Sequence, residues 1–182
     1  MTSFAIFAPD NGAYYYEYAQ DELFCPSCKS YIEDASYHPK ELAIKKLKTD
    51  FSFTYDGQLL LSNKAVEVLR EAAATELIFF TVNQKPEIFI LESTRTIVFD
   101  SNKRMTRFVD PCSQCGNFAS IVGSTPVFLS GADDLGRLHL ATTDLKFGSG
   151  KEKSPLYIVG EDLGRKLKLV FREIELEEVK EG

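Results

Sequence analysis

Two segments of the chain share one pattern of hydrophobic and polar residues, and each predicts a strand, a helix and a second strand. In the first segment, Gln58–Leu61 predicts a strand and Asn63–Ala74 a helix, with Ser62 as the N-cap. Glu76–Val82 predicts the returning strand. The apolar residues of this helix fall on one face: Ala65, Val66, Leu69, Ala72 and Ala73.

The second segment lies near the end of the chain. Leu156–Val159 predicts a strand, Gly160–Asp162 a cap region, Leu163–Leu169 a short helix and Arg172–Val179 a strand. The two segments have nearly equal length and the same order of elements. Two interpretations remain open: a diverged internal repeat, or two instances of a common β-α-β motif.

The rest of the chain is mostly β in its pattern, with one exception. Pro39–Lys48 carries apolar residues at Leu42, Ala43 and Leu47, which predicts an amphipathic helix with a basic outer face. Further short strands are predicted at Phe4–Ala8, Ala13–Tyr18, Glu87–Leu91, Thr96–Asp100, Met105–Val109, Phe118–Val122 and Val127–Leu129. We therefore expect an α+β fold, a β-rich single domain over residues 1–182.

All four cysteines of the chain occur in two short pairs, Cys25-Pro-Ser-Cys28 and Cys112-Ser-Gln-Cys115. A CxxC pair bends the backbone so that both sulfurs point at one centre, and two pairs supply the four sulfurs of a closed tetrahedral zinc site. The pairs are separated by 83 residues. We expect Cys25, Cys28, Cys112 and Cys115 to bind one structural Zn²⁺ that ties two distant parts of the chain together.

Two other kinds of sulfur chemistry compete with zinc. Two disulfides require an oxidising compartment, but the first ten residues lack a basic region followed by a long apolar run, so we expect a cytoplasmic protein with reduced thiols. A thioredoxin-like redox pair requires a CxxC at the start of a helix, and neither pair is placed that way. Gly116 follows the second pair and favours a metal knuckle, because glycine adopts positive φ at little cost.

The strands predicted around the cysteines indicate how the zinc site is built. A knuckle in the bend between two strands is the construction of a zinc ribbon. Met105–Val109 leads into the second pair and Phe118–Val122 follows it, while Ala13–Tyr18 precedes the first pair. We therefore expect a zinc-ribbon-like subdomain formed from about 14–33 and 105–122, inserted in the β-rich domain.

Charge and composition limit the possible partners. The chain has 27 acidic and 21 basic residues, a net charge of −6, which disfavours binding dominated by the nucleic-acid backbone and suits a basic protein partner. Its longest apolar run, Leu77–Val82, is far shorter than the roughly 20 residues of a membrane span. We expect no membrane partner.

The sequence carries no recognisable catalytic pattern. The two histidines, His38 and His139, lie in no metalloprotease or triad motif, and Gly148–Lys151 does not have the spacing of a phosphate-binding loop. Pro111–Cys115 matches half of the zinc-deaminase signature, but no histidine precedes a glutamate by two residues. Because four sulfurs leave no open coordination position for water, we expect that the protein is not an enzyme.

The cysteine motifs resemble those of a known family. A CPxC followed far downstream by a CxxCG, in a chain of this size, resembles the double-CxxCG-motif immunity proteins of bacteria, which are encoded beside secreted or contact-delivered toxins. Asp134-Leu135, Leu156–Val159 and Ile174–Val179 are similar to the closing unit of that family. The resemblance extends from Phe4 to Val179. The chain departs from the family at Lys29, where glycine is usual.

The resemblance implies a cytoplasmic antidote that binds a cognate toxin and blocks it, with the four cysteines holding the fold. The acidic balance adds the hypothesis that an acidic surface docks on a basic toxin, such as a nuclease, and occludes its active site. It identifies neither the toxin nor the contact surface. Three segments are candidates for that surface: Tyr14–Tyr18, Gly148–Pro155 and Glu173–Glu181. The alternative is a zinc-ribbon nucleic-acid-binding or regulatory module using the basic stretches Lys40–Lys48 and Lys103–Arg107. A metalloenzyme or thiol oxidoreductase is a third hypothesis.

Overall fold

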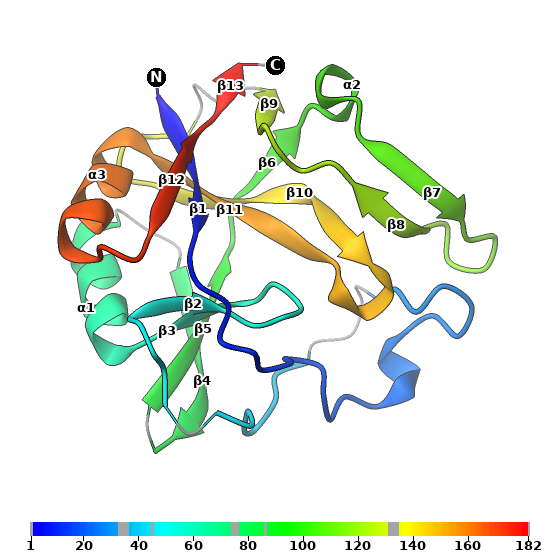
Figure 1. The fold of residues 1–182 in the computed structure, drawn as a ribbon, viewed down its shortest axis with the longest axis horizontal. Helices are drawn as coiled ribbons and strands as arrows, with labels where there is room; N and C mark the ends of the chain where they lie inside the picture. The colour runs from blue at the N-terminus through cyan, green and yellow to red at the C-terminus, as the bar shows by residue number, and fades with distance from the viewer. Residues whose placement is uncertain are drawn as a thin grey trace.

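The larger of two β-sheets returns on itself. The computed structural model describes residues 2–32, 37–44, 46–73, 77–85, 87–130 and 135–181, and within these ranges seven strands pair in the order β12-β1-β11-β10-β6-β9-β13. Their bounds are β1 Ser3–Phe7, β6 Thr96–Phe99, β9 Phe128–Ser130, β10 Leu140–Ser149, β11 Ser154–Gly160, β12 Glu175–Glu178 and β13 Lys180–Glu181. The first and last strands of this order, β12 and β13, are separated along the chain only by Val179. The two edges of the sheet therefore meet (Figure 1).

Side chains that alternate along these strands fill two different cores. Ala5, Ala141 and Ile158 belong to one cluster, together with Phe99 and Leu129 from β6 and β9. Their neighbours along the strands, among them Ile6, Leu140 and Val159, belong to a second cluster that includes the helices. This alternation is the two-residue period of a sheet with both faces covered.

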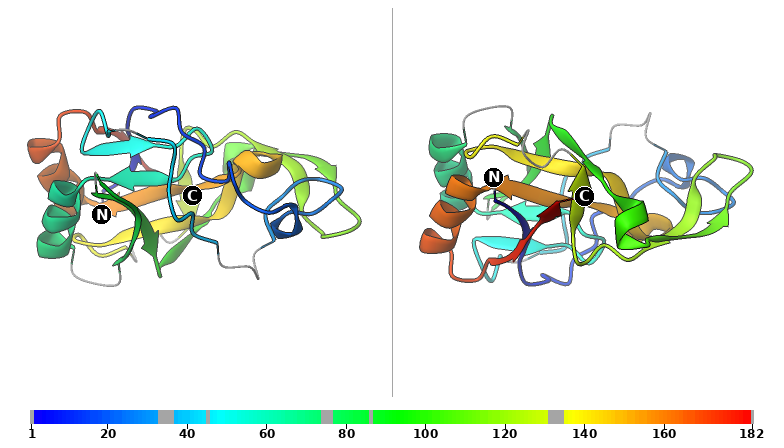
Figure 2. Two further views of the ribbon diagram at one scale, coloured as in Figure 1. Left: turned by 90° about the horizontal axis from the view of Figure 1, so that it is seen from below. Right: turned by 90° about the horizontal axis from the view of Figure 1, so that it is seen from above.

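The smaller sheet has the order β2-β3-β5-β4. Its strands are β2 Phe51–Phe53, β3 Leu59–Leu61, β4 Leu77–Gln84 and β5 Glu87–Ser93. One face packs against α1 (Asn63–Ala72) and α3 (Glu161–Val170) in the cluster shared with the larger sheet. The other face is covered by residues of the 13–15 and 42–44 segments. Figure 2 shows α1 and α3 side by side at one end of the molecule.

Both predicted strand-helix-strand segments are present. In the first, β3 and β4 both pair antiparallel with β5, and in the second, β11 and β12 both pair antiparallel with β1. Each helix therefore connects two strands that flank a third. Ser62 is the N-cap of α1, because its hydroxyl accepts the Ala65 N–H at 3.2 Å. The predicted ends Ala74 and Glu76 lie outside the described residues.

The helix predicted over Pro39–Lys48 is wrong. In the described part of this range the chain is irregular. The side chain of Asn83, which is buried on β4, accepts the Leu42 N–H at 2.8 Å and donates to the Leu42 and Ile44 carbonyls at 3.2 and 3.5 Å. These bonds hold Leu42 and Ile44 against the smaller sheet. Tertiary hydrogen bonds thus replace those that a helix would make within itself.

The strand predicted over Ala13–Tyr18 is also wrong, since Tyr15–Tyr18 form turns. The carboxylate of Asp56 is buried and accepts the N–H of Tyr15 at 2.9 Å and that of Tyr16 at 3.0 Å. A carboxylate that binds two successive N–H groups fixes a turn and takes both donors away from any strand ladder. Asp56 lies some 40 residues along the chain from this turn.

Several of the remaining elements differ from the predictions. The sequence did not indicate β10, which is ten residues long, the short β2 or a helical turn at Ser101–Arg104, and β12 is shorter than predicted. In the segment Gly148–Pro155, β10 continues to Ser149 and β11 begins at Ser154, with only a 3-10 turn, Gly150–Glu152, between them. Asp134 lies outside the described residues.

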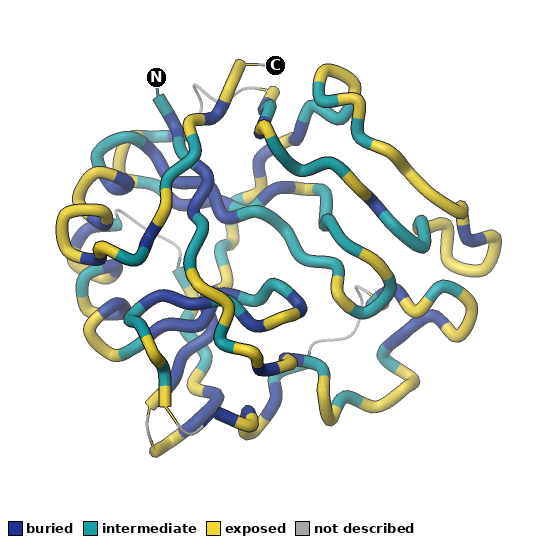
Figure 3. The backbone as a smooth tube through the Cα atoms, viewed as in Figure 1, coloured by how far each residue is buried: buried dark blue, intermediate teal, exposed yellow. Residues whose placement is uncertain are grey.

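A two-stranded arm projects from the larger sheet. After the single-turn helix α2 (Ser101–Arg104), β7 (Arg107–Pro111) pairs with β8 (Phe118–Val122), which in turn pairs with the end of β10. All five residues of β7 are exposed, as Figure 3 shows. Among the described helices, none is both long and apolar enough to cross a bilayer.

Candidate metal centre

The four cysteine sulfurs lie together at the end of the molecule opposite α1 and α3. The tip of the β7–β8 arm carries Cys112 and Cys115, and the N-terminal segment with Cys25 and Cys28 lies beside it (Figures 1 and 2). All four Sγ atoms are within 4.8 Å of one another. The fold therefore brings together all four residues that the sequence singled out as metal ligands.

The spacing of the sulfurs fits a metal ion and does not fit disulfides. The Sγ atoms of Cys25 and Cys112 are 3.7 Å apart, and those of Cys28 and Cys115 are 3.5 Å apart. Four sulfurs at about 2.3 Å from a tetrahedral zinc are about 3.8 Å from each other. A disulfide requires about 2.05 Å, and all four thiols are free.

The two pairs fold into equivalent knuckles. Cys25 donates its N–H to the Ser30 carbonyl at 2.8 Å and accepts the Lys29 N–H at 2.9 Å. Cys112 donates to the Asn117 carbonyl at 2.7 Å and accepts the Gly116 N–H at 2.9 Å. The second knuckle lies in the β7–β8 hairpin, whereas the first is bounded by a single bridge between Phe24 and Tyr31. A local backbone pattern thus orients each pair of sulfurs.

The sulfurs differ in burial and in electrostatic surroundings. Cys25 and Cys112 are buried, while Cys115 is exposed and Cys28 intermediate. The N–H groups of Cys115 and Gln114 point at the Cys112 sulfur and lower its pKa to about 6. The Asn117 N–H acts in the same direction on Cys115, but burial and the neighbouring sulfurs prevail and raise its pKa to about 11. Four crowded sulfurs resist full ionisation unless a cation lies between them.

A third segment, the turn between β10 and β11, joins the two knuckles. The Lys153 ammonium donates to the Ser30 hydroxyl and to the Phe118 carbonyl, both at 2.6 Å. Ser30 in turn lies 3.1 Å from the Cys28 sulfur. Burial lowers the pKa of Lys153, and the Cys28 charge acts against that shift. No local signal in the sequence points to Lys153, because its partners lie 123 and 35 residues away.

The same turn also contacts the N-terminal segment that carries the first cysteine pair. Lys151 Nζ lies 3.2 Å from the Asp21 carboxylate and 4.3 Å from the centre of the Phe24 ring. The segment Gly148–Pro155, one of the three candidate partner surfaces, is therefore in part a support of the cysteine site. Because Lys151 and Lys153 already bind groups within the chain, this segment is a poorer candidate for contact with another protein.

The tyrosines of the N-terminal segment line a cavity next to the cysteine site. Tyr16 lies between Tyr31 and Tyr37, with ring centres at 5.3 and 5.8 Å. With Tyr15 and Tyr157 they line a cavity of about 280 Å³. Of the candidate surface Tyr14–Tyr18, Tyr15 is buried in this cluster, while Tyr14 and Tyr18 are exposed.

Neither histidine contributes to the cysteine site. His38 Nδ1 lies 3.0 Å from the Tyr15 hydroxyl and Nε2 lies 3.6 Å from Glu92, with the ring stacked on Phe80 at 3.7 Å. His139 packs closely against Gly136. These contacts fit structural roles for both rings.

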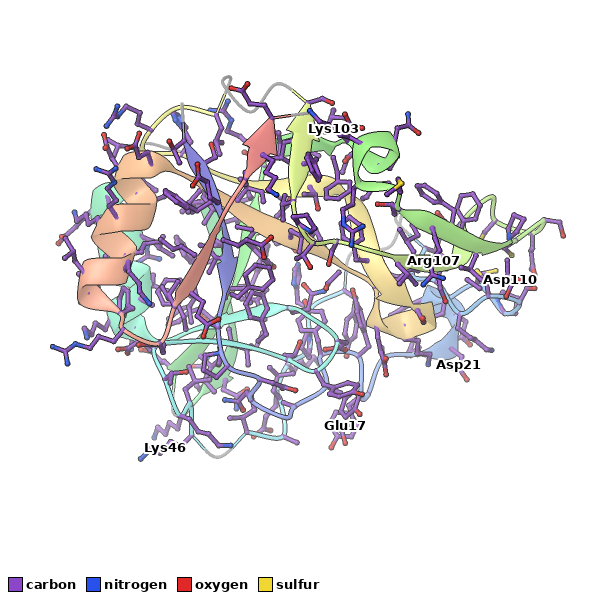
Figure 4. The ribbon with its side chains drawn as sticks, turned by 45° about the horizontal axis from the view of Figure 1, so that its top comes forward. Glu17, Asp21, Lys46, Lys103, Arg107 and Asp110 are labelled. Carbon is purple, nitrogen blue, oxygen red and sulfur yellow. The ribbon has the colours of Figure 1, made fainter. Side chains whose placement is uncertain are left out.

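The charged segments named from the sequence lie apart from one another. Figure 4 places Lys103 at α2, Arg107 at the start of the projecting arm and Lys46 at the opposite side of the molecule, so the two basic stretches do not form one continuous surface. In the third candidate surface, Glu173 accepts the Asp50 and Phe51 N–H groups at 3.0 and 3.3 Å, which is a structural role. Glu175 and Glu178 of β12 are exposed.

The donor set defines what the site could hold. Four thiolates are soft ligands that select zinc, copper(I) or iron–sulfur chemistry over calcium or magnesium. With four ligands within 4.8 Å of one another, a single tetrahedral ion would have all its positions filled by protein. Comparison of the chain with protein-family models, with curated proteins and with solved structures found no match.

Proposed function

We propose that this chain is an immunity protein, a non-enzymatic inhibitor that binds a cognate bacterial toxin in the cytoplasm and occludes its active site. The observation that carries the proposal is the meeting of a CPxC knuckle and a CxxCG knuckle in one site, from positions 87 residues apart. These are the motifs on which the resemblance to the double-CxxCG immunity proteins rests.

The metal in this proposal is Zn²⁺ in a structural role, in a zinc-ribbon-like arrangement. The S···S distances of 3.5 and 3.7 Å support it, as do two knuckles with identical backbone bonds. Zinc would join the N-terminal segment to the β7–β8 arm. Because metal-binding free energy then becomes folding free energy, the ion maintains the shape that the partner recognises.

The mode of inhibition follows from charge. A net charge of −6 favours association with a basic partner, such as a nuclease, through electrostatic steering. The exposed carboxylates of Glu175 and Glu178 on β12 are available for such a contact. A filled tetrahedral centre activates no water, which supports inhibition by binding and disfavours catalysis.

A pull-down from the native host tests the proposal. The tagged full-length chain is recovered under metal-retaining conditions, and partner identity and zinc content are measured on the same sample. We expect one toxin-like protein at near-equal amount, and co-expression of this chain should restore growth to cells that produce that toxin. Failure of the folded, zinc-loaded chain to bind or neutralise the product of a neighbouring toxin gene would refute the proposal.

One observation favours the alternative of a nucleic-acid-binding or regulatory module. Arg107 is exposed at the start of the projecting arm, and Lys103 is exposed on the preceding α2, so cations lie close along the chain where the arm begins, as on surfaces that bind a nucleic-acid backbone. The separation of Lys46 from this arm argues against an extended basic surface. Salt-dependent binding to DNA or RNA at near-physiological ionic strength would support the module, and its absence would remove it.

A further inference from the structure

The four sulfurs of the metal centre form two layers. Cys25 and Cys112 lie side by side in the buried layer, and Cys28 and Cys115 lie side by side in the outer layer. Each layer therefore contains one sulfur from each of two arms, which are the N-terminal segment around Cys25 and Cys28 and the β7–β8 arm. The outer pair is separated by 3.5 Å and the buried pair by 3.7 Å, so a reagent arriving from solvent meets a pair of sulfurs that belongs to both arms.

The two outer sulfurs differ in their surroundings. Cys115 is exposed, whereas Cys28 is partly covered and lies 3.1 Å from the Ser30 hydroxyl, which also accepts a hydrogen bond from Lys153. Its greater exposure makes Cys115 the first sulfur that an oxidant meets, and the Cys28 sulfur, 3.5 Å away, is in position to react next.

We propose that Cys28 and Cys115 are a site of reversible oxidation by hydroperoxides, and that the product is a disulfide between the two arms that takes the place of the metal ion. The proposal rests on the zinc centre of the proposed function. It concerns a modification of that centre and not the recognition of a toxin.

The chemistry balances with a single equivalent of hydrogen peroxide. The Cys115 sulfur attacks one peroxide oxygen, the O–O bond breaks, and the departing hydroxide takes up a proton to become water. The resulting sulfenic acid is attacked by the Cys28 thiolate; the S–S bond forms, the S–O bond breaks, and a second hydroxide leaves as water. Two thiolates, one peroxide and two protons give one disulfide and two waters. Zn²⁺, left with two sulfurs, dissociates.

The position of this disulfide determines the consequence for the fold. A disulfide within a CxxC pair connects two residues of the same arm. After the metal has left, such disulfides would leave the two arms without a covalent connection. A disulfide from Cys28 to Cys115 joins positions 87 residues apart, the same two segments that the metal joins. The oxidised chain therefore retains a covalent connection between its arms, which limits unfolding after the metal has left.

Peroxide treatment of the zinc-loaded full-length chain tests the inference. Released zinc is followed with a chromogenic chelator, and disulfides are mapped by mass spectrometry of non-reduced peptides. We expect one zinc released for each disulfide formed, a peptide joining Cys28 to Cys115 as the main product, and recovery of the metal centre with dithiothreitol and Zn²⁺. The metal-free chain in denaturant is the control, because there the short Cys25–Cys28 and Cys112–Cys115 loops close most easily.

Two variants make the test specific. Cys25→Ser and Cys115→Ser each remove one ligand and with it the metal, so both variants are compared as metal-free chains without denaturant. Only Cys115→Ser lacks the outer pair, so only Cys25→Ser should form the disulfide between the arms. Disulfides within the CxxC pairs of the zinc-loaded parent, or zinc retained through peroxide treatment, would overturn the inference and leave the proposed function untouched. A purified chain that binds no zinc would overturn the metal centre and this inference with it.

Discussion

Lys29 and Gly116 occupy equivalent positions in the two knuckles: both have positive φ, 61° and 75°, and both donate an N–H to the carbonyl of the first cysteine of their pair. Glycine adopts this conformation freely, whereas a residue with a side chain pays for it in steric strain. The first knuckle therefore keeps the shape of the second despite a residue that disfavours it. This departure from the double-CxxCG pattern leaves the geometry of the sulfurs intact.

Single substitutions at Lys29 and Gly116 should change the free energy of unfolding in opposite directions. Lys29→Gly should stabilise the zinc-loaded chain by up to about 1 kcal/mol, and Gly116→Ala should destabilise it by about 1 kcal/mol. A Cβ at Gly116 would meet no atom within 4 Å, so the second effect isolates backbone strain. Urea denaturation at fixed zinc concentration measures both changes. Equal effects of the same sign would contradict the equivalence of the knuckles.

Lys153→Met should lower the affinity of the cysteine site for zinc by about tenfold, the smaller end of the effect seen for groups that support metal ligands. The substitution keeps an apolar stem of similar length but removes the ammonium that joins Ser30 to Phe118. Competition with a chelator of known affinity measures the change. Lys151→Met, in the same turn, is the matched control, because its pair with Asp21 is at the surface. Equal affinities for the two variants would show that Lys153 has no special role.

Asp56→Ala should destabilise the fold by about 2–3 kcal/mol, because one buried and one partly buried N–H group lose a charged acceptor. Those groups belong to Tyr15 and Tyr16. Asp56→Asn retains one acceptor oxygen and should cost less. Thermal or urea unfolding gives the ranking. If Asp56→Ala unfolds at the same denaturant concentration as the parent, the carboxylate does not hold the turn at Tyr15.

Asn83→Ala should release the 42–44 segment from the smaller sheet at a cost of about 2 kcal/mol. The specific readout is hydrogen exchange at the Leu42 amide, which donates to the Asn83 side chain. We expect faster exchange there, with little change in the α1 amides. Uniformly faster exchange throughout the chain would instead indicate general destabilisation, and unchanged exchange at Leu42 would contradict the proposed contact.

The sequence predicted the elements whose signals are local. The amphipathic face and Ser62 cap of α1, the helix and strands near the end of the chain and the bends at both cysteine pairs depend on residues within a few positions of one another. The helix over Pro39–Lys48 and the strand over Ala13–Tyr18 were wrong because Asn83 and Asp56, about 40 residues distant, bind those backbones. Lys153 was missed for the same reason.

The metal content of the purified full-length chain, compared with that of Cys112→Ser, tests the central claim most directly. Both proteins are purified without added chelator, their zinc is quantified by mass spectrometry, and their unfolding is followed in urea. We expect about one zinc per parent chain, lost together with several kcal/mol of stability in Cys112→Ser, because metal binding contributes to folding. A parent chain without bound metal, or a variant that unfolds at the same urea concentration as the parent, would contradict it.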